Sequence, residues 1–356
     1  MYSKTEVVFY QYFNEAIAIL ESKLKCRKAL ILSGCEQDNI LFKKKLFSRQ
    51  IFCVEIFMLE QIPIKIEQIC QLFNVNEDIR GVITFDERLI DVAKYISSIM
   101  NVPCFLFCAN INFSLFNQIF IKNDKKFEKY VITNQVYIMM KEDKINEIQT
   151  LSDFSTASLC LLDLLSSNQI ASTSCEYKRL KRYLTCAIVE LKAEEYVKAE
   201  KNIVEFYTLM AQNYNFVSTH LMLALLAEQL LSNEEQICVC KFVFNAFLSA
   251  IKFKKTKVLP CDYSLNLTEL VLKYGLDKLW LIKELRAQLK VLEGLNINVF
   301  LTEAKLLNKL LVDSIKSSKT YKVKPISKQL KQLLTHCKYL PLGINTMTLI
   351  REILCE

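Results

Sequence analysis

One stretch in the N-terminal half alternates between strand-like and helix-like patterns. The apolar run at 82–85 predicts a strand, the amphipathic segment at about 89–100 predicts a helix, and the apolar run at 103–109 predicts a second strand. Strand, helix and strand in this order form the unit of a parallel α/β sheet. Ligands on such sheets bind at the carboxyl ends of the strands, which are here residues 84–88 and 110–115.

The segments on either side extend this pattern. Short apolar runs at 28–34 and 51–58 predict two earlier strands, and a further strand is expected within 131–140. Amphipathic segments between them predict helices over 15–25, 40–48 and 63–73. The N-terminal part therefore reads as a parallel sheet with connecting helices.

The spacing of apolar residues in the sequence changes near residue 148. From there to the C-terminus, apolar residues recur at three- and four-residue spacing, and no convincing strand is found. We therefore expect an α/β plus all-α architecture, with a Rossmann-like parallel-sheet domain over 1–148 and an all-helical domain over 149–356. A cleft between the two domains is the expected ligand site.

Composition narrows the class of protein. Hydrophobic residues make up 52% of the chain and charged residues 24%, as in globular proteins. The net charge of +8 comes from basic residues spread along the chain, so we expect no nucleic-acid partner. No run of 18 apolar residues predicts a membrane span. The N-terminus lacks a secretory signal, and the 14 scattered cysteines fit reduced thiols, so we expect a cytoplasmic protein.

Glycine is scarce, which matters for nucleotide chemistry. The chain has five glycines in 356 residues, against a usual frequency of about 7%. Loops that hold phosphates bring backbone amides close to the ligand, and this approach favours residues without a Cβ atom. A nucleotide-binding protein with so few glycines has lost such a loop or replaced it.

Residues 85–91 carry a family resemblance. They read Phe-Asp-Glu-Arg-Leu-Ile-Asp, followed in register by Lys94-Tyr95, where the sn-glycerol-1-phosphate dehydrogenase branch of the iron-containing alcohol dehydrogenase and dehydroquinate synthase superfamily has Gly-Ser-Gly-Thr-Ile-Asn-Asp and Lys-Tyr. The loop after Pro103 is similar to the family's Thr-Ala-Pro-Ser-Met-Asp-Gly loop. Residues 153–160 resemble its Gly-Phe-Gly-Asp-Leu-Leu-Gly-Lys helix start. The resemblance implies a dinucleotide site, and the matching positions are Phe85, Asp86, Glu87, Asp91, Asn110 and Ser114.

The resemblance also implies a metal site, because the family holds its metal with one Asp and two His. The matching positions in this chain are Thr156, His220 and Asn233, so one of the three ligands is kept. A threonine and an asparagine are poor substitutes for a carboxylate and an imidazole on a divalent ion. At the dinucleotide turn, Phe85 and Glu87 replace both glycines, and their bulk and charge oppose binding of a pyrophosphate.

Several of these residues also have a plain structural explanation, and His220 can be read as a histidine on a helix face next to a cleft. The acidic residues Asp86, Glu87 and Asp91 suit the first turn of a helix, where the helix dipole favours negative charge. We expect Lys94 to face solvent, Tyr95 to face the core, and Cys160 to be a buried thiol.

Three functions are compatible with the resemblance, and the least specific of them is a non-redox enzyme of the same fold that uses a phosphate-bearing ligand. The first is a pseudoenzyme that has lost the metal and nicotinamide sites, needs no cofactor, and acts by binding a protein partner or a second copy of itself. The alternative is a divergent oxidoreductase that uses NAD(P) and Zn, Ni or Fe to reduce dihydroxyacetone phosphate or a similar polyol or phosphate substrate. The sequence names no catalytic residue for that alternative.

Overall fold

The computed structural model describes residues 5–24, 28–34, 40–57, 79–108, 111, 116, 118–123, 126–131, 134–166, 170–213, 232–252 and 297–322. The chain divides into two compact units, Met1–Lys144 and Ile145–Glu356. The expected helix at 63–73 lies outside the described residues.

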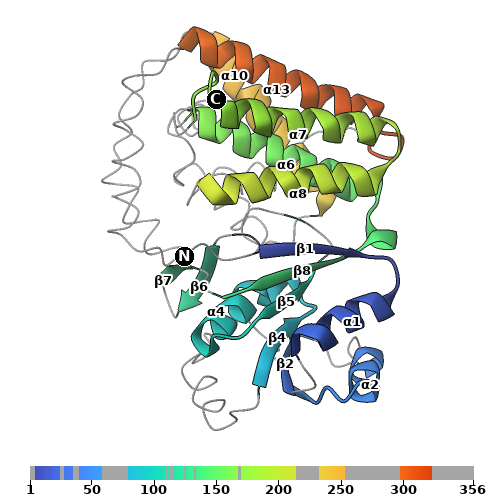
Figure 1. The fold of residues 1–356 in the computed structure, drawn as a ribbon. Helices are drawn as coiled ribbons and strands as arrows, with labels where there is room; N and C mark the ends of the chain where they lie inside the picture. The colour runs from blue at the N-terminus through green and yellow to red at the C-terminus, as the bar shows by residue number, and fades with distance from the viewer. Residues whose placement is uncertain are drawn as a thin grey trace. The chain divides into compact units, whose positions relative to one another are not determined.

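A six-stranded sheet forms the centre of the first unit (Figure 1). All of its neighbouring strands pair in parallel. The strands, in their order across the sheet, are β1 (Thr5–Tyr10), β8 (Val136–Lys141), β5 (Cys104–Phe107), β4 (Ile79–Thr84), β2 (Lys28–Ser33) and β3 (Cys53–Phe57). The interior strands β2, β4, β5 and β8 are almost continuously buried, as expected for a parallel sheet.

Helices cover both faces of this sheet. Alternate strand residues, including Ile31, Ile83 and Phe105, share a core with α1 (Phe13–Leu24) and α2 (Ile40–Ser48). The intervening residues face the other way, and Cys104 lies close to Ser97 of α4 (Ile90–Met100). This two-sided burial explains why the sequence of these strands is apolar without alternation.

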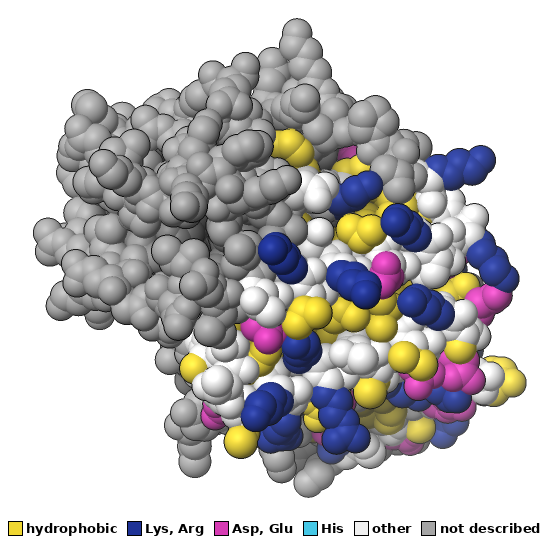
Figure 2. Space-filling model, turned by 90° about the horizontal axis from the view of Figure 1, so that it is seen from above, with side chains coloured by type: hydrophobic (Ala, Val, Ile, Leu, Met, Phe, Trp, Pro, Cys, Tyr) yellow, Lys and Arg dark blue, Asp and Glu magenta, His cyan; other side chains and the backbone are white. Residues whose placement is uncertain are grey.

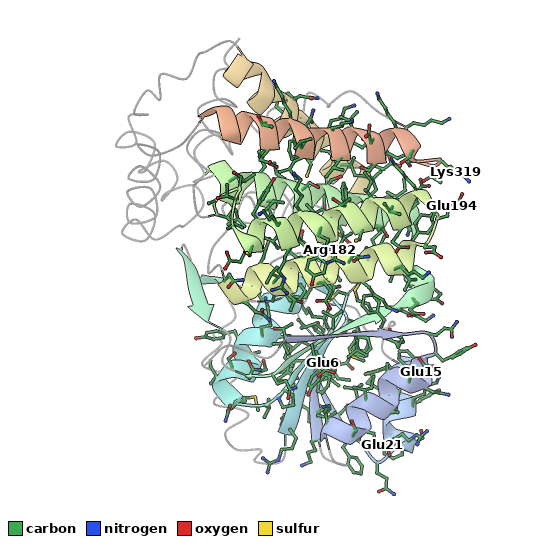
Figure 3. All side chains as sticks on the ribbon, turned by 45° about the horizontal axis from the view of Figure 1, so that its top comes forward. Glu6, Glu15, Glu21, Arg182, Glu194 and Lys319 are labelled. Carbon is green, nitrogen blue, oxygen red and sulfur yellow. The ribbon has the colours of Figure 1, made fainter. Side chains whose placement is uncertain are left out.

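Helix α1 lies so close to β4 that a side chain at position 81 would displace a neighbouring residue. A Cβ atom on Gly81 would lie 2.4 Å from Cδ2 of Leu24 and 3.3 Å from Cε2 of Phe105. At its start α1 is capped by Glu15, whose carboxylate accepts a hydrogen bond of 2.9 Å from the backbone N–H of Gln11. Figure 3 shows Glu15 and Glu21 on α1, and Glu6 on β1.

Two parts of this unit differ from the sequence prediction. The region expected to give one strand over 131–140 gives β7 (Lys126–Val131) and β8, with a bend between them. Strand β7 pairs with β6 (Gln118–Asn123) in an antiparallel hairpin that is not predicted. The sequence also does not predict β1, which is only partly buried.

The described part of the second unit is helical. Its helices are α6 (Glu147–Ser166), α7 (Cys175–Lys192), α8 (Tyr196–Asn213), α10 (Asn233–Lys252) and α13 (Ile297–Ser317). Helix α6 contacts the other four, and its residues 151–162 are all buried. A helix buried on every side lies at the centre of a helical domain. Among the described helices, none is both long enough and apolar enough to cross a membrane.

Polar contacts join segments that are distant in the sequence. The hydroxyl of Tyr177 on α7 donates to Oε2 of Glu303 on α13 at 2.5 Å, and Nζ of Lys181 lies 2.7 Å from the same oxygen. After α7, Glu194 forms an ion pair with Lys319, which follows α13 (Figure 3). These contacts hold the ends of α7 and α13 together.

Candidate functional site

The carboxyl end of β4 is packed with aromatic rings. Phe85, directly after β4, stacks on Phe107 at the end of β5 with 4.4 Å between ring centroids. Phe42 of α2 meets Phe85 edge-on, also at 4.4 Å, and Phe107 at 5.4 Å. The partly buried ring of Phe85 therefore packs against the hydrophobic core at the place where a phosphate-binding turn would expose backbone amides.

Two backbone amides in the turn after Phe85, those of Asp86 and Leu89, already donate hydrogen bonds. The hydroxyl of Thr84 accepts a hydrogen bond from the N–H of Asp86 at 3.2 Å and donates to the carbonyl of Leu32 at 3.1 Å. The N–H of Leu89 donates to the carbonyl of Asp86 at 2.9 Å, which closes a short 3₁₀ turn over Glu87–Leu89. Glu87 is exposed beside this turn and would repel an approaching anion. The residues present do not fit the pyrophosphate of a dinucleotide.

Lys94 corrects one sequence expectation, because its side chain is fully buried rather than facing solvent. Its Nζ lies 2.7 Å from Oδ1 of Asp91, one turn earlier on α4. The charge of Lys94 also acts on the thiol of Cys104. Burial raises the pKa of this thiol to about 12, and the hydroxyl of Ser97 and the charge of Lys94 offset only part of that rise. A lysine and an acid three residues apart on a helix were the available sequence signal for this ion pair.

The remaining cofactor positions are placed only in part. Asp86 and Asp91 are partly exposed, and Tyr95, expected in the core, is also partly exposed. Asn110 and Ser114 lie outside the described residues.

Thr156 is buried in the interior of the helical unit and faces α10. It is 4% exposed, and its hydroxyl lies close enough to the Cys240 thiol to offset part of the effect of burial, which raises the pKa of Cys240 to about 12. One turn earlier, the hydroxyl of Ser152 donates to Oε1 of Gln236 at 3.0 Å. Residues 152 and 156 of α6 thus lie beside residues 236 and 240 of α10.

This register separates Thr156 from Asn233. Asn233 is the first residue of α10 and precedes Cys240 by two helical turns, or about 10 Å along the axis. Ligands of one zinc ion each lie about 2.0–2.3 Å from it, so they lie close to one another. Thr156 and Asn233 therefore do not fit one metal ion, and His220 lies outside the described residues. Within the described ranges, no three His, Cys, Asp or Glu side chains are grouped to hold a metal.

Cys160 is fully buried on α6, as expected. A further residue, Glu200, was not singled out from the sequence. Glu200 of α8 and Asp153 of α6 are acids in the interior of the helical unit. Their positions on two separate helices give no local signal, because only the packing of those helices brings them together.

Comparisons with known proteins support the fold. A scan against protein-family models and a search of curated proteins both found no match. Among solved structures, glycerol dehydrogenase from Schizosaccharomyces pombe is 13% identical, with a TM-score of 0.53 over 92% of this chain and 94% of that one. An iron-containing alcohol dehydrogenase from Thermotoga maritima is 14% identical, with a TM-score of 0.52 over 100% and 99%.

Maleylacetate reductase from Rhizobium sp. strain MTP-10005 is 13% identical to this chain, with a TM-score of 0.51 over 100% of this chain and 97% of that one. At such low identity the similarity shows the fold alone. Together with the parallel sheet and the helices that follow it, these matches show that the chain has the fold of iron-containing alcohol dehydrogenases: a Rossmann-like domain followed by a helical domain.

Proposed function

We propose that this protein is a degenerate member of the sn-glycerol-1-phosphate dehydrogenase branch, a pseudoenzyme that acts through binding. The observation that carries the proposal is the packing of Phe85 against Phe107 and Phe42 at the end of β4. To admit a pyrophosphate, this ring would have to leave the core, and the amides of Asp86 and Leu89 would have to break their hydrogen bonds. Both changes oppose nicotinamide binding.

The separation of Thr156 and Asn233 supports the same proposal for the metal. A chain with neither site would need no cofactor and would act on another protein or on a second copy of itself, in the cytoplasm. We expect no nucleic-acid partner. On the described part of the face in Figure 2, lysine and arginine side chains are scattered among hydrophobic and acidic ones, without a continuous basic track.

Thermal unfolding of the full chain with NADH, NADPH, Zn²⁺ and Ni²⁺, singly and in combination, tests the proposal. A ligand that binds the native state at 100 times its dissociation constant stabilises it by ~2.7 kcal/mol. We expect that none of these four ligands changes the midpoint of the thermal transition. A shift that needs a nicotinamide and a metal together would contradict the proposal.

A double variant provides a matched comparison. Phe85→Gly with Glu87→Gly restores the two glycines that the resemblance implies. If the ring and the carboxylate block the binding of the pyrophosphate, NADH should raise the melting temperature of this double variant. The rise should exceed that of Phe85→Gly with Glu87 kept. No shift with either variant would show that the block lies elsewhere, and equal shifts would show that the carboxylate of Glu87 takes no part in it.

One observation favours the divergent oxidoreductase as a second candidate. The ion pair of Lys94 with Asp91 keeps a buried positive charge on α4, next to the strands whose ends would hold a cofactor. In that case the protein would reduce dihydroxyacetone phosphate or a similar substrate with NAD(P)H and a divalent metal. NADH oxidation that depends on substrate and on Zn²⁺, Ni²⁺ or Fe²⁺ would establish this candidate.

A further inference from the structure

Glu200 is a buried acid without a good hydrogen-bonding partner among the residues that the structure describes. It lies on α8, is 0% exposed, and neither of its carboxylate oxygens accepts a well-formed hydrogen bond from a described residue. Asp153 and Thr150, one turn apart on α6, approach the Glu200 carboxyl across the helix interface. Asp153 is 3% exposed and Thr150 is 0% exposed. Two carboxyl groups therefore meet in the core of the helical unit.

Another buried glutamate of the same unit shows what Glu200 lacks. Glu147 accepts hydrogen bonds from the N–H of Lys319 at 2.7 Å and from the hydroxyl of Thr320 at 2.6 Å. Burial alone would raise the pKa of Glu147, but these hydrogen bonds outweigh it and lower the pKa. For Glu200, burial dominates and raises the pKa to about 7, and Asp153 and Thr150 offset only part of the rise.

Among the residues that the structure describes, the buried groups of this unit are acidic or neutral. In the described part of this unit the buried ionisable acids are Glu147, Asp153 and Glu200, and no lysine or arginine is buried with them. From α8 itself, Tyr207 lies near both acids, and its neighbours include the thiols of Cys160 on α6 and Cys240 on α10. On α7, the buried face is apolar except for Tyr177, whose hydroxyl is bonded to Glu303.

We propose that Glu200 and Asp153 form a proton-binding site that makes the packing of α8 on α6 depend on pH. Two carboxylates this close in a buried interface cannot both be charged at low cost, so the pair keeps one proton between its oxygens near neutral pH. When the pH rises, the proton leaves to solvent, a second negative charge enters the interface, and α8 is held less firmly. The site lies within the helical unit and does not depend on the proposed function.

The direction of the effect follows from linkage. The folded pair holds its proton up to about pH 7, whereas an unfolded glutamate releases it near 4.5. Between these values the folded state binds more protons than the unfolded state, so its stability falls as the pH rises. Glu200 therefore destabilises the folded state least below pH 4.5 and most above pH 7.

The experiment compares Glu200→Gln with wild type in the full chain from pH 4.5 to 8. Glutamine keeps the shape of the side chain but cannot ionise. We expect the melting temperature of the variant to exceed that of wild type by ~5 °C at pH 8, and this difference to vanish toward pH 4.5. Hydrogen exchange of residues 196–213, corrected for the intrinsic rate, should show the same pH-dependent difference. Glu205→Gln, an exposed position on the same helix, is the control and should give a difference that does not vary with pH.

Several results would overturn the proposal. A difference between Glu200→Gln and wild type that is constant across this range would show that Glu200 does not titrate in it. Infrared spectra provide a readout that does not depend on the stability of the variant: wild type at neutral pH should show the carbonyl stretch of a protonated carboxylic acid, and its absence would contradict a shared proton. If K⁺, Mg²⁺ or Ca²⁺ at pH 8 stabilises wild type but not Glu200→Gln, the pair binds a metal ion instead.

Discussion

A single side chain determines what the end of β4 can do. Phe85 is in contact with two other rings, and each such aromatic pair stabilises a fold by about 0.5–1.5 kcal/mol beyond its buried area. The residue therefore has a structural role at a position that the resemblance assigns to a cofactor. Restoring glycine there would remove these contacts, so the variants with Phe85→Gly should be assayed well below their melting temperatures.

At the same scale, the buried Lys94 leads to a prediction. Lys94→Ala should destabilise the protein by ~2–3 kcal/mol, because it removes one partner of a largely buried ion pair and leaves a cavity. Lys94→Met keeps most of the volume and should cost clearly less. Urea denaturation gives both values, and equal losses would mean that packing around Lys94 contributes nothing.

Some residues of the candidate site could be placed from the sequence, and others could not. Phe85 and Glu87 follow a strongly apolar strand, so their position at its end was predictable from local pattern. The burial of Lys94 was missed because a lysine on a surface helix is usually exposed. The separation of Thr156 from Asn233 depends on the register between α6 and α10, which is set by contacts between distant segments.

At the scale of the element, the approach of α1 to β4 gives a second prediction. Gly81→Ala should destabilise the first unit by ~1–3 kcal/mol, because the new methyl group would collide with Leu24 in a packed core. The double variant Gly81→Ala with Leu24→Ala should lose less than the sum of the single losses. Additive losses in thermal or urea unfolding would contradict this contact.

The start of α6 gives a third prediction, with a defined pH dependence. Glu147→Gln should cost ~1 kcal/mol at neutral pH, since the carboxylate accepts three hydrogen bonds from the segment after α13. The pKa of Glu147 is lowered by folding, so its contribution is present above the unfolded value of 4.5 and is lost as the pH falls below it. The stability difference between variant and wild type should therefore shrink in acid. A difference that grows below pH 4.5 would contradict the assignment.

The elements differ in how well the sequence predicts them. Strands β2 and β5 are continuous apolar runs because they are covered on both faces, and the helices of the second unit show clear periodicity. The sequences of β1 and of the hairpin of β6 and β7 show only a weak strand pattern. Strand β1 is only partly buried, and the hairpin sequences mix charged and apolar residues, so tertiary pairing rather than local pattern defines them.

At the scale of the whole molecule, the sequence places the domain boundary after residue 148, and the compact units divide after Lys144. The two positions lie about one helical turn apart. The fold class was predictable because it depends on the order of many elements. The expected cleft between the domains stays a prediction.

The division into two units leads to a fourth prediction. Residues 145–356 expressed alone should give a helical far-ultraviolet circular dichroism spectrum and a cooperative thermal transition, because α6 has its buried neighbours within that unit. The full chain should contain a transition with the same midpoint. A fragment without cooperative unfolding would show that the second unit needs the first.

The pairing of β1 with β8 bears on how the protein is made. Thr5 lies opposite Val136, so β1, which precedes the other described strands of its sheet in the sequence, pairs with the strand that comes last among them. Translation of almost the entire first unit must be complete before β1 finds its hydrogen-bonding neighbour, and such long-range closure is slow. During that interval the apolar residues Val7, Val8 and Phe9 have no sheet to join. Chaperones that bind extended apolar segments should therefore act on the β1 segment of the nascent chain before β8 has been made.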